Sequence, residues 1–508
     1  MRKIWKVTAA AAALTLGLSA CSASEPAAPT RTTLNVAMRA EPTSFVPALG
    51  TGDELSTLYL VYDRLIDFDP QTGELLPDAG IASEWGFDDD SGTSFSMTIK
   101  DGITFQDGTP LDAEAVAQSL DYTRNARTIQ PLATSDLDDV TDVRAVGDKV
   151  EITLDKPFSP LPTILTGRAG LVVSPTAIEK YGEDAGLHDA GSGPYRVVTW
   201  DQGVSWTLER SDSYWGDPGA FEKIQFSFIA DADARLNAFR AGQVDFIWDI
   251  DPIEYTSLQS DSAVRVQLEK NLRVSSVAMI QSGPWADPRV RQALNLAIDR
   301  ESLARAVFPT LPDAAKDYPS NLPVPTWNWA ATEAPGIKFD PDQSRKLLAD
   351  AGYGNGLPFL LCVVATDVVA NTTAEILRTQ LADVGIQLNV VTQPTFAPCN
   401  EGARAGKYDG GFGTMTGNID PHTAYTFEIT VAALGGTYPT IQAGLDKVAA
   451  ATTRDEQIGI YGDINDEWQK VVPVTLVFSR PLLVGYNAEL KGSAESYEGI
   501  PRLRNISF

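Results

Sequence analysis

The stretch Phe359–Val390, FLLCVVATDVVANTTAEILRTQLADVGIQLNV, decides the fold class. Phe359–Val364 is typical of a strand, Thr372–Val384 of a helix, and Ile386–Val390 of a second strand. A strand, a helix and a strand in this order predict a parallel pair joined by a crossover helix. The sequence therefore predicts an α/β protein.

Capped helices lie on both sides of this stretch. Asp287 is a predicted N-cap with Pro288 at the first helical position, and Asp340–Gln343 has the pattern of a capping box. The helix after Asp340 is expected to end before Gly352. Behind Asp287, the apolar residues of an amphipathic helix recur at i, i+3, i+4, i+7 and i+8: Val290, Ala293, Leu294, Ala297 and Ile298.

The N-terminal half combines strand alternation with further helix signals. Strands are predicted at Thr33–Met38, Ser94–Lys100 and Val244–Trp248. Turn residues predict a hairpin at Phe68–Glu74. The predicted helices are Asp53–Leu65, a helix from the N-cap Asp112 to Tyr122, and Asp231–Ala241, which Gly242 ends.

The first 32 residues have the pattern of an export signal and a tether. Positive charges at residues 2, 3 and 6 precede the apolar run Val7–Leu18, which predicts a signal peptide over residues 1–20. Leu18–Cys21 resembles the bacterial lipobox, in which the cysteine is acylated and becomes the first residue of the mature chain. Cleavage by an ordinary signal peptidase, with Cys21 incidental, is the alternative. Residues 21–32 are expected to be a lipidated cysteine and a flexible tether, so we expect the protein outside the cytoplasmic membrane and anchored to it.

Composition and motifs argue against several classes of function. The 508 residues carry a net charge of −27, whereas nucleic-acid binding needs basic patches that neutralise phosphates. With two histidines and three cysteines, no cluster has the spacing of a zinc site, so neither a metal nor a cofactor is expected. The motifs of the common hydrolases are absent, so we expect no catalytic residues and no enzyme activity. Cys362 and Cys399 are expected either to form a disulfide or to be two buried thiols.

Six blocks, in order over most of the mature chain, resemble one family. They are similar to the extracytoplasmic solute-binding proteins of peptide and nickel ABC importers, family 5. Most of these blocks are turns and core-facing elements, so they identify a fold and not a ligand. The blocks are Val61–Ile66 with Leu76–Pro77 and Ala82–Trp85, Phe95–Pro110, Gly191–Tyr195, Arg235–Asp245, Val290–Arg300, and Phe339–Tyr353.

The resemblance implies a two-lobed periplasmic-binding-protein clamshell, class II and cluster C, with an extra inserted sub-domain. Lobe I would comprise residues 33–74, 188–272 and 481–508, the inserted sub-domain residues 75–187, and lobe II residues 273–480. Two crossing segments would act as a hinge, and the ligand would lie between the lobes and stabilise their closed form.

The resemblance also implies a role in import. The chain would be a monomer that captures a small solute, most simply an oligopeptide or dipeptide, and delivers it to the permease subunits of an ABC transporter. The alternative solutes are an oligosaccharide, an opine or siderophore-like compound, and a nickel chelate. The alternative classes are an exported enzyme acting on glycosides or peptides, and a surface sensor or adhesin with the same fold.

One position departs from the family's peptide binders. These commonly place an aspartate after a tryptophan and before an Asp-Pro step, where it pairs with the α-amino group of the peptide. Alignment on Asp420-Pro421 leaves Gly417 in that place, and no tryptophan precedes it. Either another carboxylate, such as Glu41 or Asp249, replaces the aspartate, or the solute is not a standard peptide.

The candidate ligand contacts come from four places in the chain. His422, which follows the glycine-rich loop of residues 410–418, is interpreted as a surface or capping residue. Exposed aromatic side chains can stack on apolar, aromatic or sugar faces. The candidates are Arg39, Glu41 and Thr43 after the first strand, Trp248 and Asp249 after another strand, Trp327 and Trp329 in a proline-rich loop, and Phe412, Met415, Thr416 and Asn418 in the glycine-rich loop.

Overall fold

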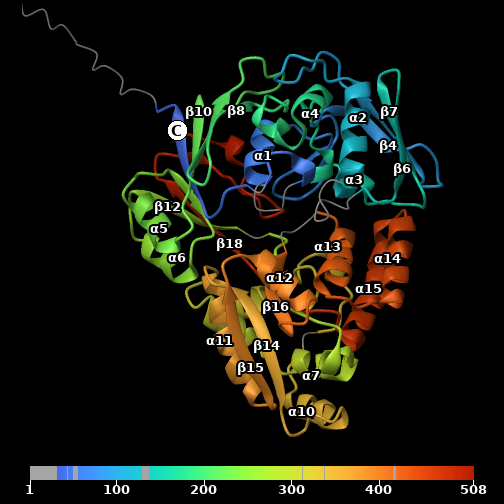
Figure 1. Cartoon of the computed structure of the whole chain (residues 1–508), viewed down its shortest axis with the longest axis vertical. Coiled ribbons are helices and arrows are strands. Elements are labelled where there is room, and N and C mark those ends of the chain that lie inside the picture. Colours follow the sequence, from blue (N-terminus) through green and yellow to red (C-terminus); the bar gives the residue numbers. More distant parts are fainter. Residues whose placement is uncertain are drawn as a thin grey trace, which may run out of the picture. The chain divides into compact units, whose positions relative to one another are not determined.

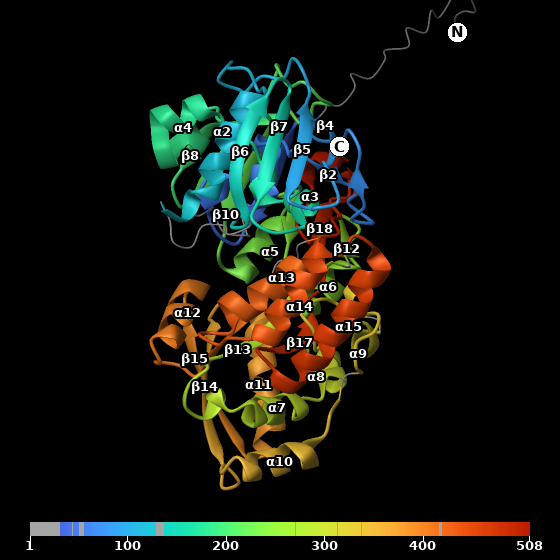
Figure 2. The ribbon, with the colours of Figure 1, turned by 90° about the vertical axis from the view of Figure 1, so that its right-hand side faces the viewer.

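Three larger β-sheets organise the part of the chain that the structure, a computed structural model, describes (Figures 1 and 2). The described residues are 31–42, 44–49, 55–128, 137–269, 271–311, 313–336, 338–415 and 419–508. From Thr32 onward they belong to one compact unit. The predicted signal peptide, the lipidation site Cys21 and nearly all of the tether lie outside the described residues.

The first sheet has seven strands drawn from separated parts of the sequence. Thr33–Met38 (β1) lies parallel to both of its neighbours, Lys223–Phe228 (β10) and Phe246–Trp248 (β11), and the other pairings are antiparallel. The C-terminal strand Leu482–Asn487 (β18) pairs with β11, so the end of the chain completes the sheet that its beginning starts. The order is β12 (Val264–Glu269), β18, β11, β1, β10, β9 (Ser205–Arg210) and β8 (Tyr195–Asp201).

The second sheet has five strands and contains the predicted parallel pair. Leu357–Val364 (β14) and Ile386–Gln393 (β15) pair in parallel over eight residues, and the helix Val368–Ala382 (α11) connects them. The predicted α/β class is confirmed. The helix starts before the predicted Thr372 because Asp367 accepts a hydrogen bond from the N–H of Ala370 and so caps it. The order is β15, β14, β16 (Gly410–Met415), β13 (Val274–Met279) and β17 (Thr475–Ser479).

The third sheet is antiparallel and lies within residues 82–154. The alternation predicted at residues 94–100 is observed, because Phe95, Met97 and Ile99 are buried together against Val116 and Leu120 of the helix Ala113–Arg124 (α2). Figure 2 shows this helix beside the sheet. The strands are β4 (Ala82–Phe87), β5 (Ser94–Ile99), β7 (Lys149–Leu154) and β6 (Val140–Val146).

The predicted aspartate caps are present, and several helix bounds differ from prediction. Asp112, Asp231, Asp287 and Asp340 each accept a hydrogen bond from a backbone N–H in the first turn. The helix predicted after Asp287 ends at Leu296, because Asp299 caps a second helix from Arg300. The predicted hairpin is formed by Asp67–Phe68 (β2) and Leu75–Leu76 (β3).

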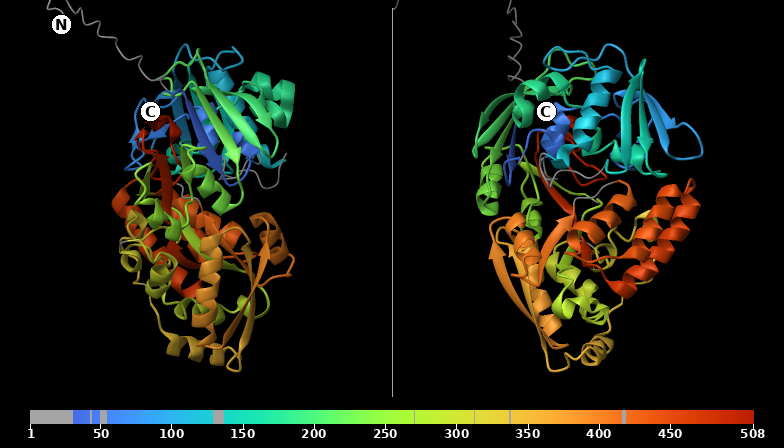
Figure 3. Two further views of the ribbon diagram at one scale, coloured as in Figure 1. Left: turned by 90° about the vertical axis from the view of Figure 1, so that its left-hand side faces the viewer. Right: turned by 45° about the vertical axis from the view of Figure 1, so that its right-hand side comes forward.

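The remaining elements complete the architecture (Figure 3). None of the helices in the described ranges has both the length and the apolar character needed to cross a bilayer. The helices are α1 (Leu55–Val61), α3 (Leu161–Ile164), α4 (Pro175–Tyr181), α5 (Ala232–Arg240), α6 (Pro252–Leu258), α7 (Pro288–Leu296), α8 (Arg300–Val307), α9 (Ala314–Asp317), α10 (Pro341–Asp350), α12 (Phe396–Arg404), α13 (Pro421–Phe427), α14 (Pro439–Ala450) and α15 (Arg454–Val471), and the short strands are β19 (Lys491–Gly492) and β20 (Ile506–Ser507).

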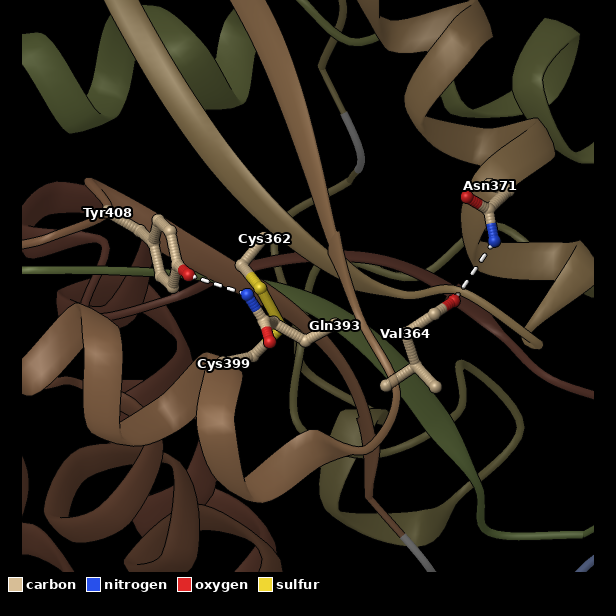
Figure 4. Close-up of a disulfide and its surroundings, with 6 residues drawn as sticks. All are labelled: Cys362, Val364, Asn371, Gln393, Cys399 and Tyr408. Atoms are coloured by element: carbon tan, nitrogen blue, oxygen red, sulfur yellow. Dashed lines mark hydrogen bonds between the residues drawn. A yellow bond between two sulfur atoms is a disulfide. The ribbon is translucent and has the colours of Figure 1, made fainter.

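A disulfide joins Cys362 of β14 to Cys399 of α12, with the two Cα atoms 5.5 Å apart (Figure 4). Both cysteines are buried. Next to the disulfide, the side-chain amide of Gln393 donates a hydrogen bond to the hydroxyl of Tyr408, at 2.8 Å. The disulfide therefore fixes α12 to the five-stranded sheet. Of the two states that the sequence left open, the structure has the bridged one.

Candidate ligand site at the two crossings between the sheets

The chain passes between the seven-stranded and the five-stranded sheet at two places that lie side by side. One crossing runs from β12, which ends at Glu269, to β13, and the other runs from β17 to β18. Arg273 stands in the first crossing and Arg480 in the second. The N–H of Arg480 donates a hydrogen bond of 2.9 Å to the carbonyl oxygen of Arg273, so the two crossings are held together at their centre.

Charged side chains from both sheets meet at these crossings. Arg273 donates to the carboxylate of Asp249, which follows β11 of the seven-stranded sheet, at 2.7 Å. Arg480 donates to the carboxylate of Asp367, which precedes α11, at 2.8 Å, and to the hydroxyl of Thr414 on β16 at 3.3 Å. Arg39, directly after β1, interacts electrostatically with both aspartates. We name Arg39, Asp249, Arg273, Asp367 and Arg480 the crossing cluster.

The arginines keep both aspartates of the crossing cluster ionised. Burial alone would raise the pKa of Asp249, but the charges of Arg273, Arg480 and Arg39 outweigh burial and hold this pKa well below its usual range. The pKa of Asp367 is lowered in the same way, because the charge of Arg480 outweighs the effect of the burial of Asp367. The cluster therefore combines three positive charges with two negative ones.

The backbone of Asp249 is in the left-handed region, with φ at +53°. Aspartate is one of the few residues besides glycine that enter this region, and strained conformations of this kind cluster at functional sites. Here the conformation follows directly on β11 and coincides with the ion pair to Arg273. Asp249 thus combines a strained backbone conformation with a buried carboxylate.

The structure gives Glu41 a different role from Asp249. One carboxylate oxygen of Glu41 accepts a hydrogen bond from the indole N–H of Trp200, and the other accepts one from the N–H of Gly203 at 3.0 Å. Both oxygens thus hold the turn between β8 and β9, outside the crossing cluster. Glu41 as a ligand contact stays a prediction.

The predicted aromatic contacts lie in three different environments. Trp248 is half-buried and packs against the core of the seven-stranded sheet, 5.9 Å from Phe246 between ring centroids. Trp327 is 38% exposed and meets the ring of Tyr497 edge-on at 5.6 Å. Trp329 lies under the guanidinium of Arg454, at 3.6 Å from its ring centroid. Trp327 therefore keeps the most accessible ring of the three.

The glycine-rich segment is more buried than a surface turn. Phe412 and Met415 lie on β16, and their side chains belong to hydrophobic cores of the molecule. His422 is buried too, and Asp420 is the residue that caps α13, so the interpretation of His422 as a surface or capping residue is wrong. Its ring meets the ring of Phe158 edge-on, and burial lowers its pKa to about 4, so it is neutral. Thr43, Thr416, Gly417 and Asn418 lie outside the described residues, and their contacts with a solute stay predictions.

Sequence reasoning found two members of the crossing cluster, Arg39 and Asp249, and missed the other three. The signal for Asp367 was its N-cap position at the end of a strand, where ligands of open α/β sheets bind. Arg273 and Arg480 carry no motif. Their signal was their position at the two boundaries of the predicted lobe II. Among the described residues, no group of three His, Cys, Asp or Glu side chains could hold a metal ion.

Known proteins share this fold over nearly the whole chain. The periplasmic binding protein DppA from Helicobacter pylori, solved with the peptide STSA, covers 94% of this chain and 98% of its own, with a TM-score of 0.82 and 17% identity. NikZ from Campylobacter jejuni, solved with Ni(L-His), covers 94% and 100%, with a TM-score of 0.82 and 21% identity. These identities show the fold alone.

Similarity of sequence shows the family. The glutathione-binding protein GsiB of Shigella flexneri is 30% identical over 331 residues, which are 63% of this chain and 61% of the relative. The chain thus matches about three fifths of the length of its curated relative. The family model of the bacterial extracellular solute-binding proteins, family 5 Middle, matches residues 77–443. This match covers well over half of the sequence, and the chain belongs to the bacterial extracellular solute-binding proteins, family 5.

Proposed function

We propose that this chain is the solute receptor of an ABC importer and that its solute is a short peptide. The predicted lobe I contains the seven-stranded sheet, and the predicted lobe II contains the five-stranded sheet. A solute bound beside the two crossings touches both lobes and stabilises their closed arrangement. The closed receptor then delivers the solute to the permease subunits.

The observation that carries this proposal is the convergence at the crossings. Asp249 comes from the seven-stranded sheet, Asp367 and Thr414 come from the five-stranded sheet, and Arg273 and Arg480 come from the crossings themselves. Polar groups from two lobes that meet at a hinge can bind one ligand from both sides. A ligand shifts an equilibrium between two arrangements only by its difference in affinity for them. Contacts of this kind supply that difference.

A second set of contacts, far from the crossings in sequence, holds the predicted lobes together. The N–H of Ser159, in the predicted inserted sub-domain, donates to the carbonyl oxygen of Ala449 of α14 at 2.7 Å. Lys156 bridges Asp139 and Asp446, with both N–O distances at 3.3 Å. The bonds from Ser159 to Ala449 and from Lys156 to Asp446 join segments about 290 residues apart, and an opening of the lobes would break them. They support the interpretation of this structure as the closed arrangement.

A peptide is favoured as the solute on two grounds. The relatives include a glutathione-binding protein and a structure solved with a tetrapeptide. The charged groups of the crossing cluster and the neighbouring hydroxyl of Thr414 also offer hydrogen-bonding groups that a zwitterionic chain of amides can use. A nickel chelate is the alternative solute, because NikZ was solved in complex with Ni(L-His).

The proposal also places the protein outside the cytoplasmic membrane, with lipid on Cys21. The support is the order of positive residues, apolar run and Leu18–Cys21 at the start of the chain. Cys21→Ser tests it. Wild-type protein should sediment with membranes and carry the mass of a lipid at its N-terminus, whereas the variant should be soluble and unmodified. A wild-type protein that is unmodified at Cys21 would contradict the anchor.

The experiment for the solute is native mass spectrometry of the purified full-length protein, followed by calorimetry. Dipeptides, tripeptides and glutathione are compared with an oligosaccharide and with Ni(L-His). A ligand at a hundred times its Kd should stabilise the protein by about 2.7 kcal/mol, which a melting curve detects. X-ray scattering with and without the solute should show a more compact bound state. If oligosaccharides raise the melting temperature and no peptide does, the peptide is the wrong solute.

A further inference from the structure

We propose that the disulfide between Cys362 and Cys399 is a redox-dependent clamp, which holds α12 and the carboxyl end of β14 in place as one wall of the candidate ligand site. The inference rests on the proposed function and deepens it, because it makes solute binding depend on the redox state of the compartment. The oxidised protein binds its solute tightly, whereas the folded protein with two free thiols binds it weakly.

The end of β14 connects the disulfide to the candidate ligand site (Figure 4). Cys362 stands two residues before Val364, whose carbonyl oxygen accepts a hydrogen bond of 3.0 Å from the side-chain amide of Asn371 on α11. Asn371 also donates to the carbonyl oxygen of Asp367 at 2.7 Å. Asp367 in turn pairs with Arg480 of the crossing cluster. The backbone that carries Cys362 therefore also positions an ion pair of the site.

The second cysteine belongs to a helix at the same edge of the five-stranded sheet. α12 follows β15, which runs parallel to β14, so α12 begins beyond the carboxyl ends of both strands. At these ends, the N–H of Ala365 donates to the carbonyl oxygen of Gln393 at 2.8 Å. Ligands of open α/β sheets bind outside this edge. The disulfide thus joins two segments that border the candidate site.

The apolar anchoring of α12 is slight. Among the side chains of α12 whose burial the structure describes, those of Cys399 and Ala403 alone are buried. They belong to a small core with Cys362, Tyr408 and Leu434. α12 has 9 residues, and isolated helices shorter than about 12–15 residues are marginal in water. Without the disulfide, α12 therefore detaches from the sheet in a large fraction of the molecules.

Detachment of α12 lowers the affinity for the solute. Only molecules with α12 in place have the complete wall, and the apparent affinity falls in proportion to the fraction of such molecules. The clamp also supports the neighbouring strand, because Tyr408 of the small core stands two residues before β16. β16 carries Phe412 and Met415, which the sequence predicts as solute contacts.

The redox step is an exchange between thiols and a disulfide. Formation of the bond removes two electrons and two protons from the thiols of Cys362 and Cys399, and a thiol–disulfide oxidant outside the cytoplasmic membrane accepts them and becomes a dithiol. Dithiothreitol reverses the step: its own two thiols close to a cyclic disulfide, and both cysteines regain their protons. Because thiols are kept reduced in the cytosol and are oxidised after export, the clamp forms only outside the cytoplasm.

The test uses the full-length Cys21→Ser protein, in which Cys362 and Cys399 are the remaining cysteines. Because both are buried, the dithiol form is prepared by unfolding and refolding in dithiothreitol, and alkylation with mass spectrometry verifies the free thiols. Calorimetry compares both forms with the dipeptide Met-Leu and with the solute that native mass spectrometry identifies. The dithiol form should bind at least about tenfold more weakly, and reoxidation should restore the affinity.

The double variant Cys362→Ala/Cys399→Ala is the matched control. It should bind as weakly as the dithiol form, and dithiothreitol should leave its affinity unchanged. Hydrogen exchange locates the change: amides of α12 should lose protection in the dithiol form, whereas those of the third sheet should keep it. Circular dichroism verifies folding, and the variant replaces the dithiol form in the comparison if that form does not fold. If neither folds, the bond is a requirement of folding and the clamp is wrong.

The two proposals fail in different ways. If the folded dithiol form binds the solute as tightly as the oxidised form, or if α12 keeps its amide protection, the disulfide serves stability alone. The clamp is then wrong, while the protein remains a solute receptor. If the oxidised protein binds no peptide, oligosaccharide or nickel chelate and co-purifies with no solute, the proposed function fails and the clamp of its site fails with it.

Discussion

Two clusters of arginines and carboxylates are buried among the residues that the structure describes, and they differ in position. The first, which we name the balanced cluster, joins Arg64, Arg502 and Arg504 to Asp63, Asp67 and Glu498 through ion pairs. The second is the crossing cluster. The balanced cluster lies within the predicted lobe I, whereas the crossing cluster joins residues of both predicted lobes through the ion pairs of Arg273 and Arg480. The difference in position separates an ion network within one lobe from an ion network at the passage between the two sheets.

The surroundings of the balanced cluster fit a structural role. The guanidinium of Arg64 lies 3.7 Å from the ring centroid of Tyr59, and that of Arg502 lies 4.1 Å from the centroid of Phe68. Arg64 donates to Glu498 at 3.1 Å, across 434 residues of sequence. The cluster thus fixes the C-terminal segment to the N-terminal elements of the same predicted lobe. An opening of the lobes would leave it intact.

The largest expected effect comes from breaking the balanced cluster. Arg64→Met leaves Glu498 buried without its main partner, and we expect a loss of about 3–5 kcal/mol in the free energy of unfolding. Denaturant titration measures this loss. Solute affinity of the folded variant should be unchanged, because Arg64 lies outside the crossing cluster. The control Arg144→Gln, which removes an exposed ion pair with Glu151, should lose no more than about 1 kcal/mol. If both variants lost the same free energy of unfolding, the buried ion pair would contribute no more to stability than the exposed one.

One buried carboxyl group outside both clusters, that of Glu428, has no arginine beside it among the described residues. Glu428 is fully buried, neither of its side-chain oxygens has a hydrogen-bond partner among the described residues, and burial raises its pKa to about 8. The folded protein thus holds a proton that the unfolded chain releases near its ordinary pKa of 4.5. Between about pH 4.5 and pH 8, this group therefore makes stability fall as pH rises.

Glu428→Gln tests this slope. The variant should lack the contribution of Glu428, which is on the order of 1.4 kcal/mol per pH unit, so it should gain stability over the wild type as pH rises toward 8. Denaturant titrations at several pH values measure the difference, in which other groups, such as Glu269 with its pKa raised by burial to about 8, cancel. A difference that does not change with pH would show that Glu428 is ionised in the folded protein.

The helices and strands could be predicted from the sequence better than the residues of the candidate site. Strand alternation, aspartate caps and the order strand–helix–strand are local signals, and Thr33–Met38, the capped helices and the parallel pair β14–β15 followed from them. The crossing cluster depends on residues from five separate stretches that meet where the chain passes between two sheets. Arg273 and Arg480 become neighbours through one backbone hydrogen bond. Periodicity does not encode a contact of this range.

The burial of some predicted ligand contacts could not be predicted from the sequence either. Phe412 follows a glycine pair and reads as part of a loop, yet residues 410–415 form the strand β16 between β14 and β13. The glycines allow this close approach: a Cβ at Gly410 would lie 2.2 Å from the carbonyl oxygen of Ala278. The glycine-rich pattern here serves the packing of strands.

A smaller effect is expected when one negative charge is removed from the crossing cluster. Asp249→Asn removes that charge, and asparagine tolerates the left-handed backbone of this position. The unliganded protein should lose about 1–3 kcal/mol of stability, because Arg273 loses an ionised partner. Affinity for a carboxylate ligand should rise relative to its neutral derivative, since a negative charge beside Arg273, Arg480 and Arg39 is gone. Calorimetry with both ligands measures the ratio, and an unchanged ratio would argue that Asp249 does not set the charge that the ligand meets.

The smallest expected effect lies at the contact between the predicted inserted sub-domain and lobe II. Lys156→Gln removes the two ion pairs to Asp139 and Asp446, which are partly exposed. Such pairs contribute about 0.2–1 kcal/mol, so global stability should hardly change. The neighbouring bond from Ser159 to Ala449 and the ring contact of Phe158 with His422 remain.

The effect of Lys156→Gln should nevertheless be specific to closure. The ion pair with Asp446 exists only while α14 faces residues 156–159, so its loss destabilises the closed arrangement alone, whereas the pair with Asp139 lies within the predicted inserted sub-domain and its loss affects both arrangements equally. Without solute, scattering should show a larger mean radius of gyration for the variant than for the wild type, and the two should converge when solute is saturating. Arg144→Gln, which removes an ion pair within the third sheet, should behave as the wild type does. If Lys156→Gln changes neither the radius nor the affinity, closure depends on the crossings alone, and the contact at Ser159 is a consequence of closure that does not stabilise it.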